Sequence, residues 1–349
     1  MTQGDRSAGK PPTLNDVARA AGVSRAMASI VLRGAPGAAD ETRTRVLAAA
    51  AELGYRRDTR ASLLRRSDSR LIGLVFQIES RFHADLVAAI REAVDAAGYD
   101  LVLGIARRRG HDELQAIDML LGYRCDALLL LGTSLSEEVL AGIASQRPVV
   151  AITRRLSVAV PGCDTIRVSD REGFRLLVDH LVALGHRDIA HVDGGDDAKA
   201  SDRLNAYVLA MEAHGLGDRI RVYRGGEWAD EGRAAARPIM ESAPLPTALV
   251  AYNDDVAWGV MGELSRSGVR VPADISVTGY DLSRTWLALP QRLTTVRQDV
   301  DALGRLSVAR AIARLQGGAD EQQDIVIEPA FVPGDTTGPP RSDADSGAD

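Results

Sequence analysis

Three polar side chains of different chemistry follow apolar stretches that are typical of strands. Asp281 comes directly after ISVTGY, Asn253 directly after TALVAY, and Arg203 lies beyond IAHVDG. In parallel α/β sheets, ligands bind at the carboxyl ends of the strands. A guanidinium, an amide and a carboxylate together supply the paired donors and acceptors that a polyhydroxyl compound needs. These residues therefore predict a binding site for a small polar molecule.

Catalytic and metal-binding patterns are absent from the sequence. No G-x-G-x-x-G follows the first strand, and no P-loop, G-x-S-x-G or H-E-x-x-H occurs. His186 and His191 flank a strand, with a spacing that does not suit a metal pair on a helix face. We therefore expect no enzyme activity, no cofactor and no metal site. Cys125 and Cys163 lack metal-like spacing and suggest a reducing, cytoplasmic compartment.

The polar residues must be positioned by the long region that starts at residue 71. Apolar stretches such as LIGLVF, CDALLLLG and PVVAIT alternate there with helical stretches. Uniformly apolar strands separated by helices indicate parallel sheets that are covered on both faces. The region is too long for one compact sheet, so we expect two doubly wound lobes. No apolar run is long enough to span a membrane.

The N-terminal stretch TLNDVARAAGVSRAMASIVLRG (13–34) predicts two short helices joined by a tight turn. Thr13 begins a capping-box-like start, Gly22 permits the turn, and Ser24 can cap the second helix. A third helix is expected over 40–53, followed by a glycine. Three short helices with this turn form a helix-turn-helix pattern, which is typical of DNA binding.

The charge distribution favours the same interpretation. Residues 1–70 hold 13 Lys and Arg against 7 Asp and Glu, a net charge of +6. The remainder holds 29 against 41, a net charge of −12. Segments of opposite sign indicate that one part of the chain meets a polyanion and the other does not.

The motifs together resemble the LacI/GalR family of bacterial transcription regulators over about residues 13–335. The head carries TLNDVARAAGVSRAMASIVLRG and TRTRVLAAAAELGYRRD, and the core carries LGHRDIAHVDG, TALVAYNDDVAWGVM, VRVPADISVTGYD and LTTVRQDVDALG. The resemblance implies a small all-α helix-turn-helix head followed by a periplasmic-binding-protein-like α/β core. That core has two doubly wound parallel-sheet lobes joined by three crossovers.

The resemblance also implies a function and partners. We expect a cytoplasmic homodimeric repressor that binds a palindromic double-stranded DNA operator and responds to a small-molecule effector, a sugar. The expected domains are a disordered tail (1–12), the head (13–57), a hinge helix or linker (58–70), the core (71–335) and a second disordered tail (336–349). The expected lobes are an N-lobe (71–167 and 298–324) and a C-lobe (168–297 and 325–335).

Family positions that contact DNA transfer to this sequence residue by residue. Those facing base edges in the major groove are Arg25, Ala26 and Ile30. Those touching phosphate are Thr13, Ser24, Ser29, Arg33, Thr42 and Tyr55. Those of the hinge helix, which enters the minor groove, are Ala61 and Leu64 in the arginine-rich RRDTRASLLRRSDSR.

Family positions that bind the effector transfer in the same way. They are Phe82, Lys199, Arg203, Trp228, Asn253 and Asp281. Asn253 and the adjacent Asp254 have an alternative role as caps of the next helix. Two departures weaken any transfer of effector identity. Thr153 stands where many members have an aspartate, and Val300 where some sugar-binding members have an aromatic residue.

Two other classes of protein stay open at this point. A solute-binding protein of a transporter has a similar core, but it needs a secretion signal and has no use for a basic head. An α/β enzyme such as a hydrolase has a similar sheet, but the catalytic motifs are missing. Binding to the protein's own upstream DNA distinguishes both classes from a regulator.

Overall fold

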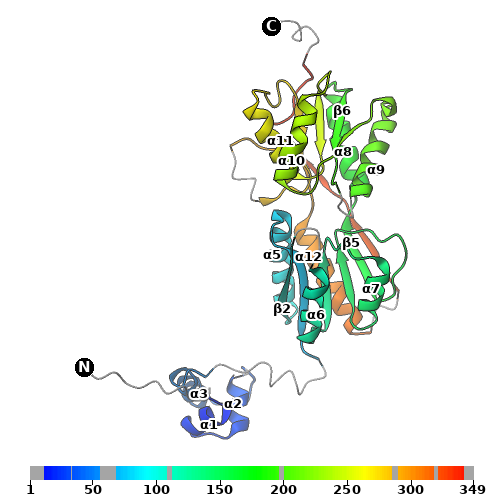
Figure 1. Ribbon diagram of the computed structural model, residues 1–349. Coiled ribbons are helices and arrows are strands. Elements are labelled where there is room, and N and C mark those ends of the chain that lie inside the picture. Colours follow the sequence, from blue (N-terminus) through cyan, green and yellow to red (C-terminus); the bar gives the residue numbers. More distant parts are fainter. Residues whose placement is uncertain are drawn as a thin grey trace, which may run out of the picture. The chain divides into compact units, whose positions relative to one another are not determined.

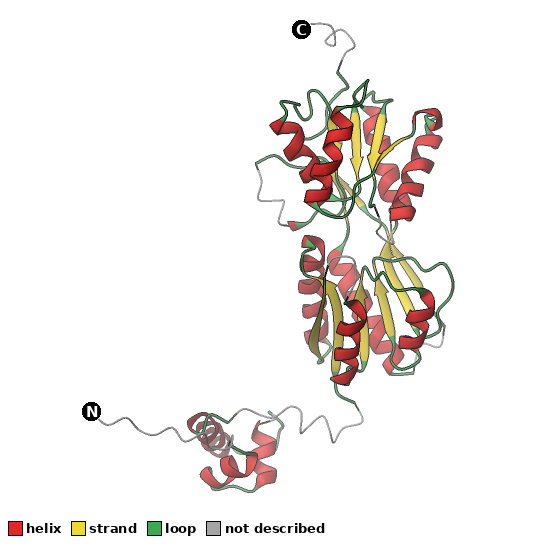
Figure 2. Cartoon of the chain, in the orientation of Figure 1, coloured by secondary structure: helices red, strands yellow, loops and turns green. Residues whose placement is uncertain are grey.

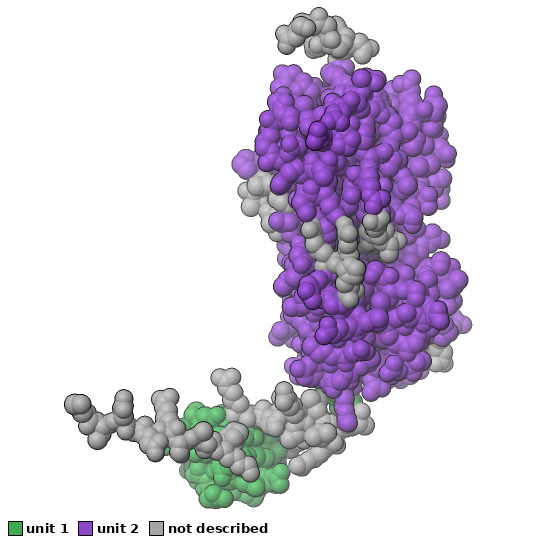
Figure 3. Space-filling model, in the orientation of Figure 1, with its two compact units in different colours: residues 1–69 green, residues 70–349 purple. Residues whose placement is uncertain are grey.

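A computed structural model describes residues 12–32, 34–55, 68–107, 112–195, 200–284, 290–317 and 321–341. The chain divides into two compact units, residues 1–69 and 70–349 (Figure 3). Among the described residues, no helix has both the length and the apolar character that crossing a bilayer requires.

The first unit is a three-helix head composed of α1 (Leu14–Ala20), α2 (Arg25–Leu32) and α3 (Asp40–Glu52) (Figure 1). The turn between α1 and α2 contains Gly22 at φ +64°, a conformation that glycine adopts without strain. The side chain of Ser24 caps α2 by accepting a hydrogen bond from the amide of Met27 at 3.2 Å. The predicted helices, the turn at Gly22 and the Ser24 cap are therefore confirmed.

The head has a small aliphatic core built from all three helices. Its buried residues are Val17, Ala18, Ala21, Ala28, Val31, Val46, Ala49 and Ala50. Leu53, the last residue of the helix expected over 40–53, is 39% exposed. The helix ends at Glu52, so Leu53 belongs to the turn that follows.

The N-lobe of the second unit is built on a parallel sheet in the order β11-β5-β4-β3-β1-β2. The strands are β1 (Leu71–Gln77), β2 (Asp100–Ala106), β3 (Ala127–Leu131), β4 (Val149–Ile152), β5 (Cys163–Val168) and β11 (Asp324–Ile327). One face packs against α5 (Arg81–Ala96) and α12 (Val300–Leu315). The other packs against α6 (Glu113–Gly122) and α7 (Glu137–Ala144).

The C-lobe repeats this layered arrangement on a parallel sheet in the order β7-β6-β8-β9 (Figure 2). The strands are β6 (Ile189–Val192), β7 (Arg221–Tyr223), β8 (Ala248–Ala251) and β9 (Ser276–Thr278). One face packs against α8 (Asp170–Ala183) and α9 (Ala200–Ala213), and a 3-10 turn, η2 (Gly217–Arg219), follows α9. The other packs against α10 (Ala229–Met240) and α11 (Asp254–Arg266). The predicted pair of doubly wound lobes is confirmed.

The chain passes between the lobes three times, and the third passage lies later than the sequence suggested. β11 pairs with β5 in register from Asp324 to Ile327, so it completes the N-lobe sheet. The predicted change of lobe between residues 324 and 325 is therefore wrong. The chain returns to the C-lobe with β12 (Ala330–Val332), which pairs antiparallel with β10 (Thr295–Arg297).

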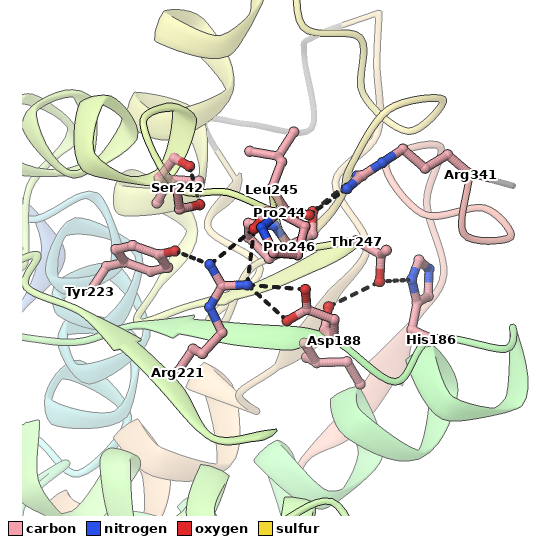
Figure 4. A network of polar contacts seen from close by, with 12 residues as sticks. His186, Asp188, Arg221, Tyr223, Ser242, Pro244, Leu245, Pro246, Thr247 and Arg341 are labelled. Atoms are coloured by element: carbon pink, nitrogen blue, oxygen red, sulfur yellow. Dashed lines mark hydrogen bonds and ion pairs between the residues drawn. The ribbon is translucent and has the colours of Figure 1, made fainter. Parts of the chain in front are cut away.

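The segment 336–341 is packed on the C-lobe, which corrects the expected disordered tail from residue 336. The side chain of Thr336 is fully buried, accepts from the amide of Thr294 at 3.0 Å and donates to the carbonyl of Val277 at 2.6 Å. Arg341 donates to the carbonyls of Pro246 and Leu245 (Figure 4). The polar composition of this segment suggested disorder. A segment that is held by hydrogen bonds carries no apolar pattern in its sequence. We call 335–341 the C-terminal strap.

Candidate effector cleft and DNA-binding head

A cavity of about 30 Å³ lies in the second unit, where strand ends and helix starts of both lobes meet. Its walls are Ser80, Phe82, His83, Thr153, Arg203, Glu227, Trp228, Tyr252, Asn253, Asp281 and Gln298. Thr153 follows β4 of the N-lobe, and Tyr252 and Asn253 follow β8 of the C-lobe. The structure thus brings together five of the six predicted effector residues, and Lys199 lies outside the described residues.

Arg203 is the buried cation of this cavity, and it is held from several sides. Its Nε donates to Asp170 at 3.1 Å, its Nη1 to the carbonyl of Tyr252 at 2.6 Å and its Nη2 to Asp281 at 3.4 Å. The guanidinium carbon lies 4.6 Å from the ring centre of Tyr252 and 4.2 Å from that of Tyr280. Burial is the largest single influence and opposes the charge, but the combined attraction of Asp170, Asp281 and the two tyrosines outweighs it, so the pKa of Arg203 lies well above its usual value.

Asp281 links Arg203 to Gln298, which directly follows β10 where the chain passes between the lobes. One carboxylate oxygen accepts from Arg203 and also, at 2.6 Å, from the amide nitrogen of Gln298. The backbone of Asp281 has φ +114°, a strained value for a residue other than glycine. Strain of this kind persists where the surrounding structure enforces it, and here it places the carboxylate in the cavity wall.

Asn253 acts as the helix cap that the sequence left open as an alternative. Its side-chain oxygen accepts from the amide of Val256 at 2.9 Å, at the start of α11. Its amide nitrogen donates to the carbonyl of Glu227 at 2.9 Å and so fixes the loop before Trp228. Asn253 therefore lines the cavity and also positions the neighbouring wall.

Asp254, the other candidate cap, lies in the protein interior instead. It accepts from the hydroxyl of Thr295 at 2.7 Å and from the amide of Ser283 at 3.0 Å. Burial and the charge of Asp281 together raise the pKa of Asp254 well above its usual value. Asp254 thus connects α11 to the loop after Asp281.

The aromatic walls come from the first turns of two helices. Phe82 on α5 is 7% exposed and belongs to the N-lobe core, whereas Trp228 is 6% exposed and directly precedes α10. Both therefore pack within their lobes and also present a surface to the cavity. His83, next to Phe82, accepts a hydrogen bond at Nδ1 from the amide of Gln77 at 3.2 Å.

Thr153 contributes a polar atom that the rest of the cavity does not use. Its hydroxyl oxygen is buried and has no hydrogen-bond partner among the described residues. The residue has φ +61°, which β-branched residues rarely adopt. A buried hydroxyl without a partner costs free energy, so it suits a polar group of a bound ligand.

Among the residues of this site that were missed at the sequence level, Gln298 and Asp170 are two that one signal could have found. Gln298 directly follows β10, and Asp170 lies two residues beyond β5. Both are polar side chains just past the end of a strand, which is the pattern that identified Asn253 and Asp281. Their neighbours in the sequence gave no reason to prefer them over other polar residues in loops.

In the head, the predicted DNA-contacting residues occupy different environments. Arg25 and Ala26 are exposed on the first turn of α2, and Ile30 is half-buried one turn later. Ser24 caps α2, and Tyr55 packs against the head core.

The remaining predicted contacts include residues at helix starts. Thr13 donates from its hydroxyl to Asp16 at 2.7 Å, at the start of α1. Ser29 and Thr42 are half-buried on α2 and α3. Arg33, Ala61 and Leu64 lie outside the described residues.

Comparison with known families separates the chain into two matching regions. Residues 13–58 match the family described as bacterial regulatory proteins, lacI family. Residues 178–337 match the periplasmic binding protein-like domain. The first region contains the head, and the second contains Arg203, Trp228, Asn253 and Asp281.

Similar proteins cover nearly the whole chain. The lactose operon repressor of Escherichia coli (strain K12) is 33% identical over 97% of this chain and 96% of its own length. The transcriptional regulator GalR of the same strain is 30% identical over 92% of this chain and 94% of its own length. A crystal structure of the lac repressor dimer, bound to operator and the anti-inducer ONPF, superimposes with a TM-score of 0.81 at 31% identity, covering 94% of this chain and all of that one.

The relatives share both the head and the core of this chain in the same order. Their names describe control of transcription, and the enzyme alternative therefore no longer applies. The resemblance seen in the sequence and the expected fold class are both confirmed. This chain is a transcription regulator that belongs to the lacI family of bacterial regulatory proteins.

Proposed function

We propose that this protein is a cytoplasmic, homodimeric repressor that releases or binds a palindromic operator in response to a small polyhydroxy effector, a sugar. The observation that carries the proposal is the convergence of Phe82, Arg203, Trp228, Asn253 and Asp281 on one cavity between strand ends of both lobes. A ligand that contacts both lobes changes their relative position, and this motion is the switch.

The head reads DNA through α2. Arg25 is exposed where α2 begins and can form a bidentate contact with guanine, while Ala26 and Ile30 offer apolar contact to a thymine methyl. Phosphate contacts from Thr13, Ser24, Ser29, Arg33, Thr42 and Tyr55 fix the register and make the affinity dependent on salt. The head lies within residues 13–58, which match the lacI family. This match supports the proposed contacts with DNA.

Residues 58–70 connect this head to the core and form the hinge. We assign Leu64 as the side chain that wedges into a base step of the minor groove, with Ala61 one turn earlier. The two hinges of a dimer must lie close together to do so. A change of lobe position that separates them weakens operator binding, because the ordering of the hinge depends on the DNA.

The N-lobe edge supports dimerisation. The edge strand β2 exposes 44% of Leu103 and 48% of Ile105, and the adjacent α6 exposes 47% of Leu114 and 42% of Met119. A contiguous exposed apolar patch of this kind marks a surface for contact with another protein chain. A second copy of this protein is the partner that a palindromic operator requires, and the solved lac repressor is a dimer on its operator.

Selection of DNA sites from a random duplex library tests the proposal. The full-length protein should enrich a symmetric site, and Leu64→Ala should weaken binding to that site much more than binding to random duplex. Asp281→Ala should bind the site but no longer respond to the effector. Absence of any symmetric preference, or equal losses for both kinds of DNA in Leu64→Ala, contradicts the proposal.

A further inference from the structure

The effector cavity carries more negative than positive charge. Among its described walls, Arg203 is the cation, and Glu227 and Asp281 are the anions. The Nδ1 of His83 is taken up by a hydrogen bond from the backbone amide of Gln77. Asp170, which binds Arg203 from behind, adds one more carboxylate.

Arg203 is already neutralised by the protein. Asp170 and Asp281 lie at 3.1 and 3.4 Å from its nitrogens, and a backbone carbonyl takes a third donor. Two tyrosine rings also pack against the guanidinium, with ring centres 4.6 and 4.2 Å from its carbon. Phosphate and carboxylate sites need arginine or lysine donors whose charge is not yet balanced, and this arginine does not provide one.

The helix starts at the cavity are also occupied by side chains of the protein. At α10, one oxygen of Glu231 accepts from the amides of Glu227 and Trp228 at 2.8 and 3.2 Å. At α11, Asn253 accepts from the amide of Val256, and at α5, Ser80 accepts from that of His83. Helix N-termini bind anions through their first backbone amides, and at α5 and α11 a side-chain cap engages one of these amides.

The sequence of two segments outside the described residues does not reverse this balance. Residues 196–199 read DDAK, with two carboxylates and one amine, and residues 285–289 read TWLAL, with no charge. The cavity does contain groups that suit a hydroxyl. The hydroxyl of Thr153 is buried without a partner among the described residues, and Arg203, Asp281 and Gln298 form an alternating set of donors and acceptors.

We propose that the effector is a polyhydroxy compound without phosphate or carboxylate groups, and that the cavity excludes its anionic derivatives. This inference rests on the proposed function, since it concerns the ligand of the same site. An added phosphate would face the carboxylates of Glu227 and Asp281 in a poorly hydrated cavity. We expect it to weaken binding by about 100-fold or more.

The test uses a polar metabolite extract of bacterial cells that is separated on an anion exchanger into an unretained and a retained fraction. Each fraction is added to the full-length protein, and both Tm and operator affinity are measured. We expect the unretained fraction to raise Tm, since a ligand that binds the folded state stabilises it. A retained fraction that raises Tm instead overturns the inference.

Two variants test whether the rise in Tm comes from binding in the cavity. Thr153→Val removes a hydroxyl that has no partner among the described residues, so the variant should fold normally and require about tenfold more of the unretained fraction for the same shift in Tm. Glu241→Gln, on an exposed residue at the end of α10, is the matched control and should respond like the unchanged protein. Equal responses of all three proteins contradict the assignment to this cavity.

The two readouts separate this inference from the proposed function. An unretained compound that raises Tm without changing operator affinity contradicts the proposed switch and leaves the inference in place. A retained compound that changes operator affinity supports the switch and contradicts the inference.

Discussion

At the scale of single residues, Asp254 is a buried carboxyl group whose pKa departs strongly from its usual value. It is 2% exposed, and both burial and the nearby charge of Asp281 raise its pKa well above the usual value. The folded protein therefore holds a proton on Asp254 at pH values where the unfolded chain has lost it. Its contribution to stability is fully present below about pH 4 and decreases as the pH rises toward the folded pKa.

Asp254→Asn removes this titration while keeping the shape of the protonated side chain. Between pH 5 and 7, the free energy of unfolding of the variant should rise relative to that of the unchanged protein by up to about 1.4 kcal/mol per pH unit. Urea denaturation at each pH measures the difference. Asp274→Asn is the control, because a hydrogen bond from Arg270 lowers the pKa of Asp274, and that variant should show no such gain.

Site residues could be predicted from sequence where a polar side chain directly follows an apolar strand. Asn253 and Asp281 meet this condition and reach the cavity. The place of Arg203 in the effector site was predictable. Its ion pair with Asp170 and its packing against two tyrosine rings were not, because these partners come from three other segments of the chain. Likewise, the strained backbone of Asp281 has no local sequence signal.

At the scale of elements, the C-terminal strap explains how the C-lobe sheet is finished. Its backbone and side chains bond to β9, to residues before β10 and to the loop at 244–246. His186 also bonds at Nε2 to the carbonyl of Gly338 at 2.8 Å. The strap therefore supplies hydrogen bonds to backbone groups of the C-lobe that would otherwise be buried without partners.

Two truncations test the strap. Removal of residues 336–349 should lower the free energy of unfolding by about 3–6 kcal/mol, because several buried hydrogen bonds are lost and their partners stay buried. Removal of residues 342–349 leaves every described contact of the strap in place and serves as the control. Chemical denaturation compares the two. A similar stability for both truncated proteins contradicts the role of the strap.

Elements were predicted well where a pattern was local and poorly where pairing was distant. The helices of the head follow from caps and apolar spacing, and α2 spans the expected residues 25–32. The strand β11 has the alternating exposure of a sheet edge, and nothing in its four residues indicates which of two sheets it joins. Only its register with β5 assigns it to the N-lobe.

At the scale of the whole core, ligand entry requires the lobes to separate. A cavity of about 30 Å³ has room for about one water molecule, much less than a sugar needs. Polar contacts also join the lobes at α5, where Arg81 lies 3.1 Å from Asp255 and Asp85 accepts from the backbone of Arg284 at 2.8 Å. Opening must break these contacts before the effector can bind.

The rate of effector binding should therefore reach a plateau as the effector concentration rises, because separation of the lobes becomes the rate-limiting step. Tryptophan fluorescence in a stopped-flow instrument follows the reaction through Trp228. Arg81→Gln should raise the plateau about two- to fivefold, since the broken ion pair contributes modestly where Arg81 is 40% exposed to solvent. Arg91→Gln, on the same helix but paired within it to Asp95, should leave the plateau unchanged. A rate that stays linear in concentration contradicts this order of events.

The interleaving of the two lobes has a consequence for how the protein is made. The N-lobe needs α12 and β11, which the ribosome adds only after the whole body of the C-lobe. At about 5–20 residues per second, that delay is on the order of ten seconds. During this time the nascent N-lobe exposes the face of its sheet that α12 later covers. The head, whose helices are contiguous, can fold meanwhile, so chaperones should be recruited to the growing core and not to the head.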